Sequence, residues 1–203
     1  MDTTRTADPP KLGLRERKKA KTRALIQEHA LRLFREKGYD ATSIAEIAEA
    51  AEVSPTTVVR YFPAKPDLVI YDDLDERVIE AVRAQPRELS ALQAMRNAVR
   101  SVFGGLAEHE EETQRERERL MWSEPELRAA MLQELVRTER EMVDFVAARA
   151  GLPADDDRVL AVAGAGIGVS LAAWFACEGD RSLARYFDLF DAAMAHLESA
   201  LPL

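Results

Sequence analysis

Residues 42–65 read TSIAEIAEAAEVSPTTVVRYFPAK. Ser43 is followed three residues later by Glu46, which is the spacing of a capping box at the start of a helix. Ser54 and Pro55 mark a second helix start, with serine as the N-cap and proline in the first turn. The stretch therefore predicts two short helices separated by a turn of three or four residues, which is the spacing of a helix-turn-helix.

Apolar side chains recur on one face of each of these two helices, so the pair can pack together. The apolar set comprises Ile47, Ala48, Val53, Val58 and Phe62. This packing leaves polar side chains of the second helix to face outward, namely Thr56, Thr57, Arg60 and Tyr61. Arginine can bind guanine through two parallel hydrogen bonds, which are worth ~1–3 kcal/mol of discrimination against a wrong base. Arg60 is therefore the most informative candidate for reading a DNA sequence.

The rest of the chain also has the pattern of helices. A first helix is expected from about Leu14 to Lys37, where Gly38 is placed to form a left-handed C-terminal cap. A fourth helix is expected over residues 65–84, and a fifth over residues 90–109. Helix-forming Ala, Leu, Glu and Arg dominate, and no stretch shows the alternation typical of strands. The sequence therefore predicts an all-α protein with nine helices.

The charge is unevenly distributed along the chain. Residues 1–67 contain 13 lysines and arginines and 10 acidic residues, whereas residues 68–203 contain 15 and 26. The net charge of −8 thus divides into +3 and −11. From Lys11 to Arg23 there are seven basic residues, including Lys18 and Lys19. This asymmetry favours a basic DNA-binding end on an acidic body, although a basic run can also serve only solubility and non-specific attraction.

The chain is expected to be soluble and cytoplasmic, with no membrane partner. Its one cysteine, Cys177, cannot form an internal disulfide, and the first residues lack an apolar signal core. Residues 159–177 contain no charge over 19 positions, close to the ~20 that a membrane-spanning helix needs. This stretch is mostly Ala, Gly and Val, so a helix buried between other helices is the preferred interpretation.

Residues 42–65, with ALRLF at 30–34 and KGY at 37–39, strongly resemble the DNA-binding signature of the TetR family of transcriptional regulators. The resemblance is specific over about residues 14–69. It implies a disordered basic arm over residues 1–13, a helix-turn-helix domain over residues 14–64, and an effector-binding and dimerisation domain over residues 65–203. The implied function is that of a homodimeric repressor, which binds a palindromic DNA operator and is released by a small effector.

Carried over to matching positions, the resemblance also implies residue roles. Thr42 and Ser43 would bind a phosphate, and Tyr61 and Lys65 would contact phosphates that flank the half-site. The start of the recognition helix would enter the major groove with Ser54, Pro55, Thr56 and Thr57. Lys18 and Lys19 are expected to follow the phosphate backbone.

Two positions depart from the family pattern. Glu52 stands in the turn where the family often has glycine, which leaves open whether the backbone there is unusual. Val59 stands where the family usually has an aromatic residue that contacts DNA, so that contact is missing or is made by a neighbour. Both departures bear on operator choice and not on the fold.

In the C-terminal half, the resemblance implies a ligand pocket and a four-helix dimer interface. Candidate pocket residues are apolar and flexible or aromatic, although such residues at helical spacing can equally be core: Met95, Val99, Phe103, Met121, Trp122, Met131, Phe145 and Trp174. Candidate interface residues lie in the last two helices: Ala161, Ala165, Ala172, Phe187, Phe190, Met194 and Leu197. The glycine-rich residues 164–168 imitate a phosphate loop, but no strand precedes them, so close helix packing is the preferred explanation.

The effector class is indicated only by similarity. Residues 13–23, GLRERKKAKTR, look like the branch that contains mycofactocin-system regulators, which implies long-chain acyl-CoA esters as effectors. No cofactor, metal site or enzymatic activity is expected, because the three histidines are scattered and no catalytic motif occurs. The rival interpretation is a helical ligand-binding protein that has lost its operator.

Overall fold

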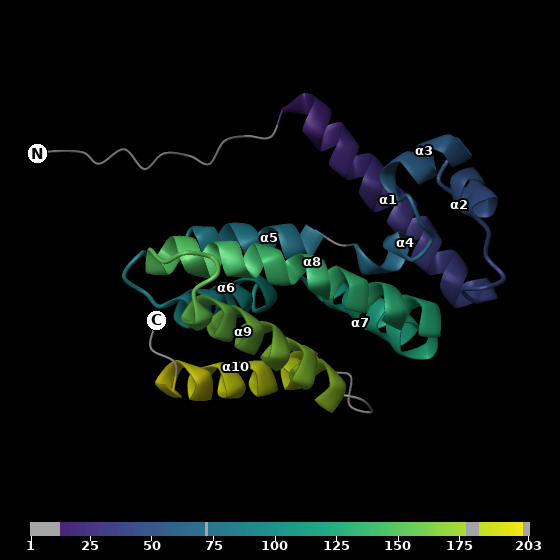
Figure 1. The fold of residues 1–203 in the computed structure, drawn as a ribbon. Helices are drawn as coiled ribbons and strands as arrows, with labels where there is room; N and C mark the ends of the chain where they lie inside the picture. Colours follow the sequence, from purple (N-terminus) through teal and green to yellow (C-terminus); the bar gives the residue numbers. More distant parts are fainter. Residues whose placement is uncertain (1–12, 72, 178–182, 201–203) are drawn as a thin grey trace, which may run out of the picture. The chain divides into compact units, whose positions relative to one another are not determined.

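The computed structural model describes residues 13–71, 73–177 and 183–200. Within these ranges the fold is all-α with no strand, as the sequence predicts, and it has ten helices (Figure 1). The expected arm at the N-terminus lies almost entirely outside the described residues. The chain divides into two compact units, Met1–Leu68 and Val69–Leu203.

The N-terminal unit is built around a long first helix and the predicted helix-turn-helix. Helix α1 spans Leu14–Lys37, α2 spans Ile44–Ala50 and α3 spans Pro55–Tyr61. Their apolar faces form a small core whose largest fully buried side chains are Ile26, Phe34, Ile47, Val58, Phe62 and Leu68. This burial holds α2 and α3 in fixed orientation on α1 and leaves their remaining faces to solvent.

Over its described residues, the C-terminal unit has six helices after α4. They are α5 (Asp73–Arg83), α6 (Ala91–Phe103), α7 (Glu108–Ser123), α8 (Pro125–Ala150), α9 (Asp157–Ala176) and α10 (Leu183–Ala200). In Figure 1, α9 and α10 lie side by side, and both also pack on α6. The core draws on α5, α6, α8, α9 and α10, with Leu92, Met95, Val146, Val159 and Met194 among its members.

Two expected helices are shorter in the structure. The helix expected over residues 65–84 is interrupted: a short α4 (Asp67–Ile70) ends before Tyr71, and α5 begins at Asp73. Asp73 and Asp75 fall in the first turn of α5, and aspartate is favoured in a first turn and disfavoured in helix interiors, which explains why a new helix begins here. This division gives ten helices where nine were expected.

The helix that was expected to reach His109 ends instead at Phe103. Gly104 and Gly105 follow, and glycine is costly within a helix. A Cβ atom at Gly104 would lie 2.7 Å from the carbonyl oxygen of Arg100, so this position also has no room for a side chain. The glycine pair therefore separates α6 from α7.

Helix α9 is long and apolar enough to cross a membrane by length and composition alone, and 28 % of that window is buried in the protein. Val159, Val162, Ala163, Gly166 and Ala173 are buried. The opposite side of α9 is exposed. Its exposed residues are Leu160, Ala161, Gly164, Gly168, Ala172 and Phe175. The expectation that this helix is buried between other helices is therefore wrong within one chain, because only one of its faces is covered.

Candidate nucleic-acid interface

Helix α3 presents a defined surface to solvent. Val58 and, directly after the helix, Phe62 are buried and fix α3 on the core of the unit. Thr56, Val59 and Arg60 are exposed, and their spacing of three and four residues places them on one side of the helix. The structure therefore supplies a rigid outward face of the kind that a recognition helix needs.

This face combines short and long side chains. Thr57 and Tyr61 are half-buried at its border, whereas Thr56 and Arg60 are exposed. The guanidinium carbon of Arg60 lies 5.4 Å from the centre of the Tyr61 ring. This cation–π contact gives Arg60 a preferred direction while its hydrogen-bond donors stay accessible. Val59, which the sequence marked only as a departure, shares the outward face and is 48 % exposed.

The start of α3 is fixed by a local cap. The Ser54 hydroxyl accepts a hydrogen bond from the Thr57 backbone N–H at 3.1 Å, and the two hydroxyls of these residues lie 2.9 Å apart. Pro55 occupies the first turn. The exposed end of the helix thus has oriented hydroxyls and a partial positive charge, a combination that suits a phosphate or a base edge.

Helix α2 begins with the capping box that the sequence predicts. The Ser43 backbone N–H donates to Glu46 at 2.9 Å, and the Ser43 hydroxyl accepts from the Glu46 backbone N–H at 3.2 Å. Lys37 donates to the other carboxylate oxygen at 2.7 Å. This bond, followed by those from Ser43, lowers the pKa of Glu46 to about 2. Ser43 is exposed, and its hydroxyl also donates to Glu46 at 2.9 Å, so a phosphate would have to take this donor from Glu46.

Thr42 is placed differently from its neighbour. It is only 1 % exposed, and its hydroxyl donates to the carbonyl oxygens of Gly38 at 2.8 Å and Leu33 at 3.3 Å. The side chain ties the α1–α2 connection to the end of α1. The expected phosphate contact of the Thr42 hydroxyl therefore has no support in this placement, because the group is buried and used within the protein.

Lys65 is anchored beneath the same connection. Its ammonium group donates to the carbonyl oxygen of Tyr39 at 2.6 Å and lies 4.3 Å from the centre of the Tyr39 ring. An ammonium group has three donors, so this bond leaves two for another acceptor. Lys65 is half-buried, which holds its charge at a fixed point of the surface.

The turn between α2 and α3 adopts the unusual backbone conformation that a glycine would favour. Glu52 has a φ of 53°, and it is the only residue other than glycine with a positive φ in the described part of the chain. The Val53 backbone N–H closes the turn by donating to the Ala48 carbonyl at 2.9 Å. The turn geometry thus persists despite the departure from the family pattern.

The basic residues of α1 divide into two groups. Lys18 and Lys19 are exposed near the start of the helix, where the sequence places phosphate contacts. Arg23 is half-buried, and its guanidinium carbon lies 5.8 Å from the centre of the Phe62 ring. Arg23 thus contributes to the packing of α1 against the end of α3, a role that its membership of a basic run did not reveal.

Comparisons with known proteins agree with this arrangement. Residues 26–71 match the family described as bacterial regulatory proteins, tetR family, and residues 89–202 match the MftR C-terminal domain. The chain is 35 % identical over 164 residues to the HTH-type transcriptional regulator TcmR of Streptomyces glaucescens, which covers 77 % of this chain and 73 % of that protein. The chain belongs to the TetR family.

Two further comparisons agree with this assignment. The mycofactocin biosynthesis transcriptional regulator MftR of Mycobacterium tuberculosis is 27 % identical over 161 residues, which is 78 % of this chain and 80 % of that protein. The crystal structure of a TetR transcriptional regulator from Rhodococcus sp. RHA1 has a TM-score of 0.56 at 18 % identity, covering 91 % of this chain and 98 % of that one. The fold is thus a TetR fold, and the protein is a transcriptional regulator with a helix-turn-helix.

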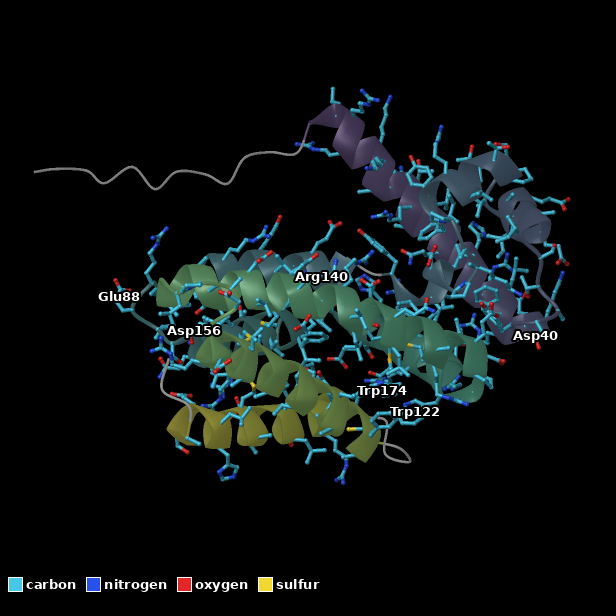
Figure 2. All side chains as sticks on the ribbon, in the orientation of Figure 1. Asp40, Glu88, Trp122, Arg140, Asp156 and Trp174 are labelled. Carbon is cyan, nitrogen blue, oxygen red and sulfur yellow. The ribbon has the colours of Figure 1, made fainter. Side chains whose placement is uncertain are left out.

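The residues expected to bind an effector lie at several places in the C-terminal unit. Val99 and Phe103 line a hollow of about 520 Å³ between α6, α7 and α10. Met95 is buried in the core, and Phe145 packs against it. Trp122 and Trp174 stack on each other, with ring centres 4.1 Å apart (Figure 2). Half-buried positions on α7 and α8 are occupied by Met121 and Met131.

The residues expected at a TetR dimer interface also divide. Ala161 and Ala172 are exposed on the open face of α9, and Ala165 is half-buried there. Phe190 and Met194 point inward and belong to the core of the same chain. The remaining two are half-buried: Phe187 has its ring centre 4.6 Å from that of Phe103, and Leu197 packs against the core.

The α6–α10 contact contains an ion-pair network that sequence reasoning missed. Arg96 donates two hydrogen bonds to the Asp191 carboxylate, at 2.6 and 2.7 Å, and Arg100 also donates to it. Arg96 further lies 3.5 Å from Glu198. Partners 95 residues apart leave no local pattern, so only the fold reveals them.

Among the described residues, no group of three or more His, Cys, Asp and Glu could hold a metal ion.

Proposed function

We propose that this TetR-family regulator is a homodimeric repressor that binds a palindromic operator through α3 and is released by a small amphipathic effector in the cytoplasm. The observation that carries the proposal is the outward face of α3. Thr56, Val59 and Arg60 are exposed there, while Val58 and Phe62 beneath them are buried. A rigid helix with an exposed polar face and a capped N-terminus is suited to the major groove.

The proposed contacts separate by chemistry. Lys18, Lys19, Ser43, Tyr61 and Lys65 bind phosphates and fix the register of the protein on the duplex, because hydroxyl and ammonium groups recognise phosphate oxygens without reading sequence. Near the groove floor, base edges are contacted by Thr56, Thr57 and Arg60. Arg60 supplies the largest share of discrimination, since its guanidinium matches the two acceptors of guanine.

The open apolar face of α9 supports the proposed dimer. Leu160 and Phe175 are 45 % and 47 % exposed, and the small residues Ala161 and Ala172 lie between them on the exposed side of the helix. Small residues permit close approach of a second helix, and burial of the two large apolar side chains stabilises the pair. A two-fold axis would place both α3 helices in successive major grooves, ~34–36 Å apart, which requires a palindromic operator.

Release follows from a change in population between two states of the dimer. An effector that moves the DNA-binding state from 99 % to 1 % must prefer the other state by ~5.5 kcal/mol. The boundary between the two units falls within α4, so the segment from Lys65 through α5 transmits the change. Similarity to mycofactocin-system regulators favours long-chain acyl-CoA esters as one effector class.

Selection from a random duplex library at moderate salt tests the DNA-binding proposal. The protein is expected to enrich a palindromic motif, and Arg60→Ala is expected to weaken binding to that motif by roughly 5- to 150-fold, from the loss of ~1–3 kcal/mol. Thr57→Ala is expected to relax selectivity at one half-site position. Arg87→Ala, an exposed arginine in the C-terminal unit, serves as the control and should leave the motif and its affinity unchanged.

Weak retention without a motif would contradict the proposal, provided that any bound effector has first been removed. Such retention, if it falls steeply with salt, is the behaviour of non-specific attraction to phosphates. In that case the helical ligand-binding protein without an operator becomes the better description.

A further inference from the structure

The hollow between α6, α7 and α10 is lined only by residues of the C-terminal unit. Its volume is about 520 Å³, which is within the ~300–1,000 Å³ typical of small-molecule sites. Arg96, Arg100 and Phe103 approach it from α6, Arg115 from α7, and Phe187 and Asp191 from α10. The hollow thus combines aromatic and charged side chains from three helices.

One wall of the hollow is aromatic. The rings of Phe103 and Phe187 lie with their centres 4.6 Å apart at an angle of 45°, and both side chains are half-buried. Val99 and Phe190 extend this apolar wall. Two tilted rings at this distance offer a surface on which a flat apolar group can stack or pack edge to face.

The other side of the hollow contains guanidinium groups whose donors are incompletely used. The Asp191 carboxylate accepts two hydrogen bonds from Arg96 and one from a single amino group of Arg100. Arg100 is 61 % exposed and Arg115, which donates to Glu111 at 2.8 Å, is 53 % exposed. A guanidinium has five N–H donors, so both arginines retain donors for a ligand.

Glu111, the partner of Arg115, is a weak competitor for a ligand. Ion pairs between exposed side chains are worth ~0–1 kcal/mol, and Glu111 is itself 39 % exposed. A bound carboxylate can therefore replace Glu111 at small cost, and Arg100 can bind it through donors that Asp191 does not use. Glu111, Asp188 and Asp191 also face the hollow, so its charge alone does not decide between an anion and a cation. The bidentate geometry of arginine favours a planar carboxylate.

We infer that this hollow binds an aromatic carboxylate, with the carboxylate on Arg100 and Arg115 and the ring against Phe103 and Phe187. The assignment of this ligand as the effector rests on the proposed function, whereas the binding site itself does not. The inference also gives Phe187 a place in a ligand site and not in a dimer interface.

Isothermal titration calorimetry of the full-length protein tests the site with three probes of the same size. They are 2-naphthoate, the uncharged 2-naphthalenemethanol and the cation 2-naphthylmethylammonium. The carboxylate is expected to bind at least tenfold more tightly than the alcohol, and the cation is expected not to bind. Arg115→Gln and Phe187→Leu are each expected to weaken 2-naphthoate binding about tenfold.

Arg119→Gln is the matched control. Arg119 lies one turn further along α7, is 63 % exposed and pairs with Glu116, but does not line the hollow. This variant should bind 2-naphthoate as the unchanged protein does. Circular dichroism of each variant establishes that a lost signal does not come from unfolding.

Several outcomes overturn the site. These are equal binding of the alcohol or the cation, unchanged binding by folded Arg115→Gln, or no binding of 2-naphthoate. The last outcome leaves the regulator proposal intact if the selected operator is still bound. Binding of 2-naphthoate without release of that operator supports the site and contradicts its role as the effector site.

Discussion

The helix starts of the N-terminal unit and the helix–helix contacts of the C-terminal unit depend on bonds that span very different distances along the chain. In the N-terminal unit, the side-chain bonds that fix the helix starts join residues three apart, as in Ser43–Glu46 and Ser54–Thr57. In the C-terminal unit, the bonds between α6 and α10 include Arg96 with Asp191, 95 residues apart. The caps of α2 and α3 can therefore be predicted from a short stretch of sequence, whereas the contact between α6 and α10 depends on tertiary packing.

The largest expected effect is a loss of stability that is confined to the N-terminal unit. Phe62→Ala removes a ring that is 1 % exposed, and such a change costs about 3–5 kcal/mol. This is comparable to the lower end of the stability of a whole domain. Hydrogen–deuterium exchange should show loss of protection in peptides from α1 to α3, together with loss of DNA binding.

Peptides from α6 to α10 should keep their protection in this variant, because Phe62 is not part of their core. Val59→Ala, at an exposed position of α3, should change stability by less than about 0.5 kcal/mol. Equal loss of protection throughout the chain would contradict the division into two independently specified units.

The next effect concerns the long-range network of the C-terminal unit. Hydrogen bonds from Arg96, and then from Arg100, lower the pKa of Asp191 to about 2. Asp191→Asn should destabilise this unit by about 2 kcal/mol at pH 7, because bonds to a charged group are lost. The depressed pKa means that the stabilisation is complete above the ordinary value of 3.8 and is lost as the pH falls towards 2.

Urea unfolding followed by circular dichroism at pH 7 and at stepwise lower pH measures this difference. The gap between the unchanged protein and Asp191→Asn should shrink below about pH 4. Asp188→Asn, an exposed carboxylate on the same helix, provides the comparison and should be nearly neutral at pH 7. A gap that is constant down to pH 2 would show that the ion pair is not its source.

Smaller effects are expected from paired cap variants, one in each unit. Ser54→Ala removes the cap of α3 and Ser90→Ala removes the cap of α6, and each should cost about 1 kcal/mol. Hydrogen exchange should locate the first loss in the N-terminal unit and the second in the C-terminal unit. Only Ser54→Ala should also weaken DNA binding. An effect of Ser90→Ala on operator affinity without any effector would contradict this separation.

The smallest expected effect is a stabilisation in the turn of the helix-turn-helix. Glu52 has a φ of 53°, which is unfavourable for a residue with a side chain. Glu52→Gly should therefore raise the stability of the N-terminal unit by about 0.5–1 kcal/mol, measured by urea unfolding. Glu49→Gly, inside α2, should lower it by about 1 kcal/mol. Destabilisation by both variants would show that the Glu52 side chain has a stabilising contact.

The contrast between local caps and long-range contacts explains which features of the fold and of the site could be predicted from the sequence. The caps at Ser43 and Ser54, the outward position of Arg60 and the all-α class follow from local spacing, and the structure has all of them. Burial of the Thr42 hydroxyl depends on the path of the chain back to α1, which spacing does not encode. In the C-terminal half, amphipathic patterns located the helices but did not distinguish Met95 in the core from Phe103 at the hollow.

The stacked indoles of Trp122 and Trp174 make the C-terminal unit its own optical reporter. They are the only two tryptophans of the chain, and their rings are 13° from parallel (Figure 2). The electronic transitions of two indoles at this distance are coupled. The near-ultraviolet circular dichroism of the protein should therefore contain a paired band that disappears when α7 and α9 separate. The DNA-binding unit has no tryptophan, so this band reports only on the effector half. One unlabelled sample can thus show whether an added ligand rearranges α7 against α9.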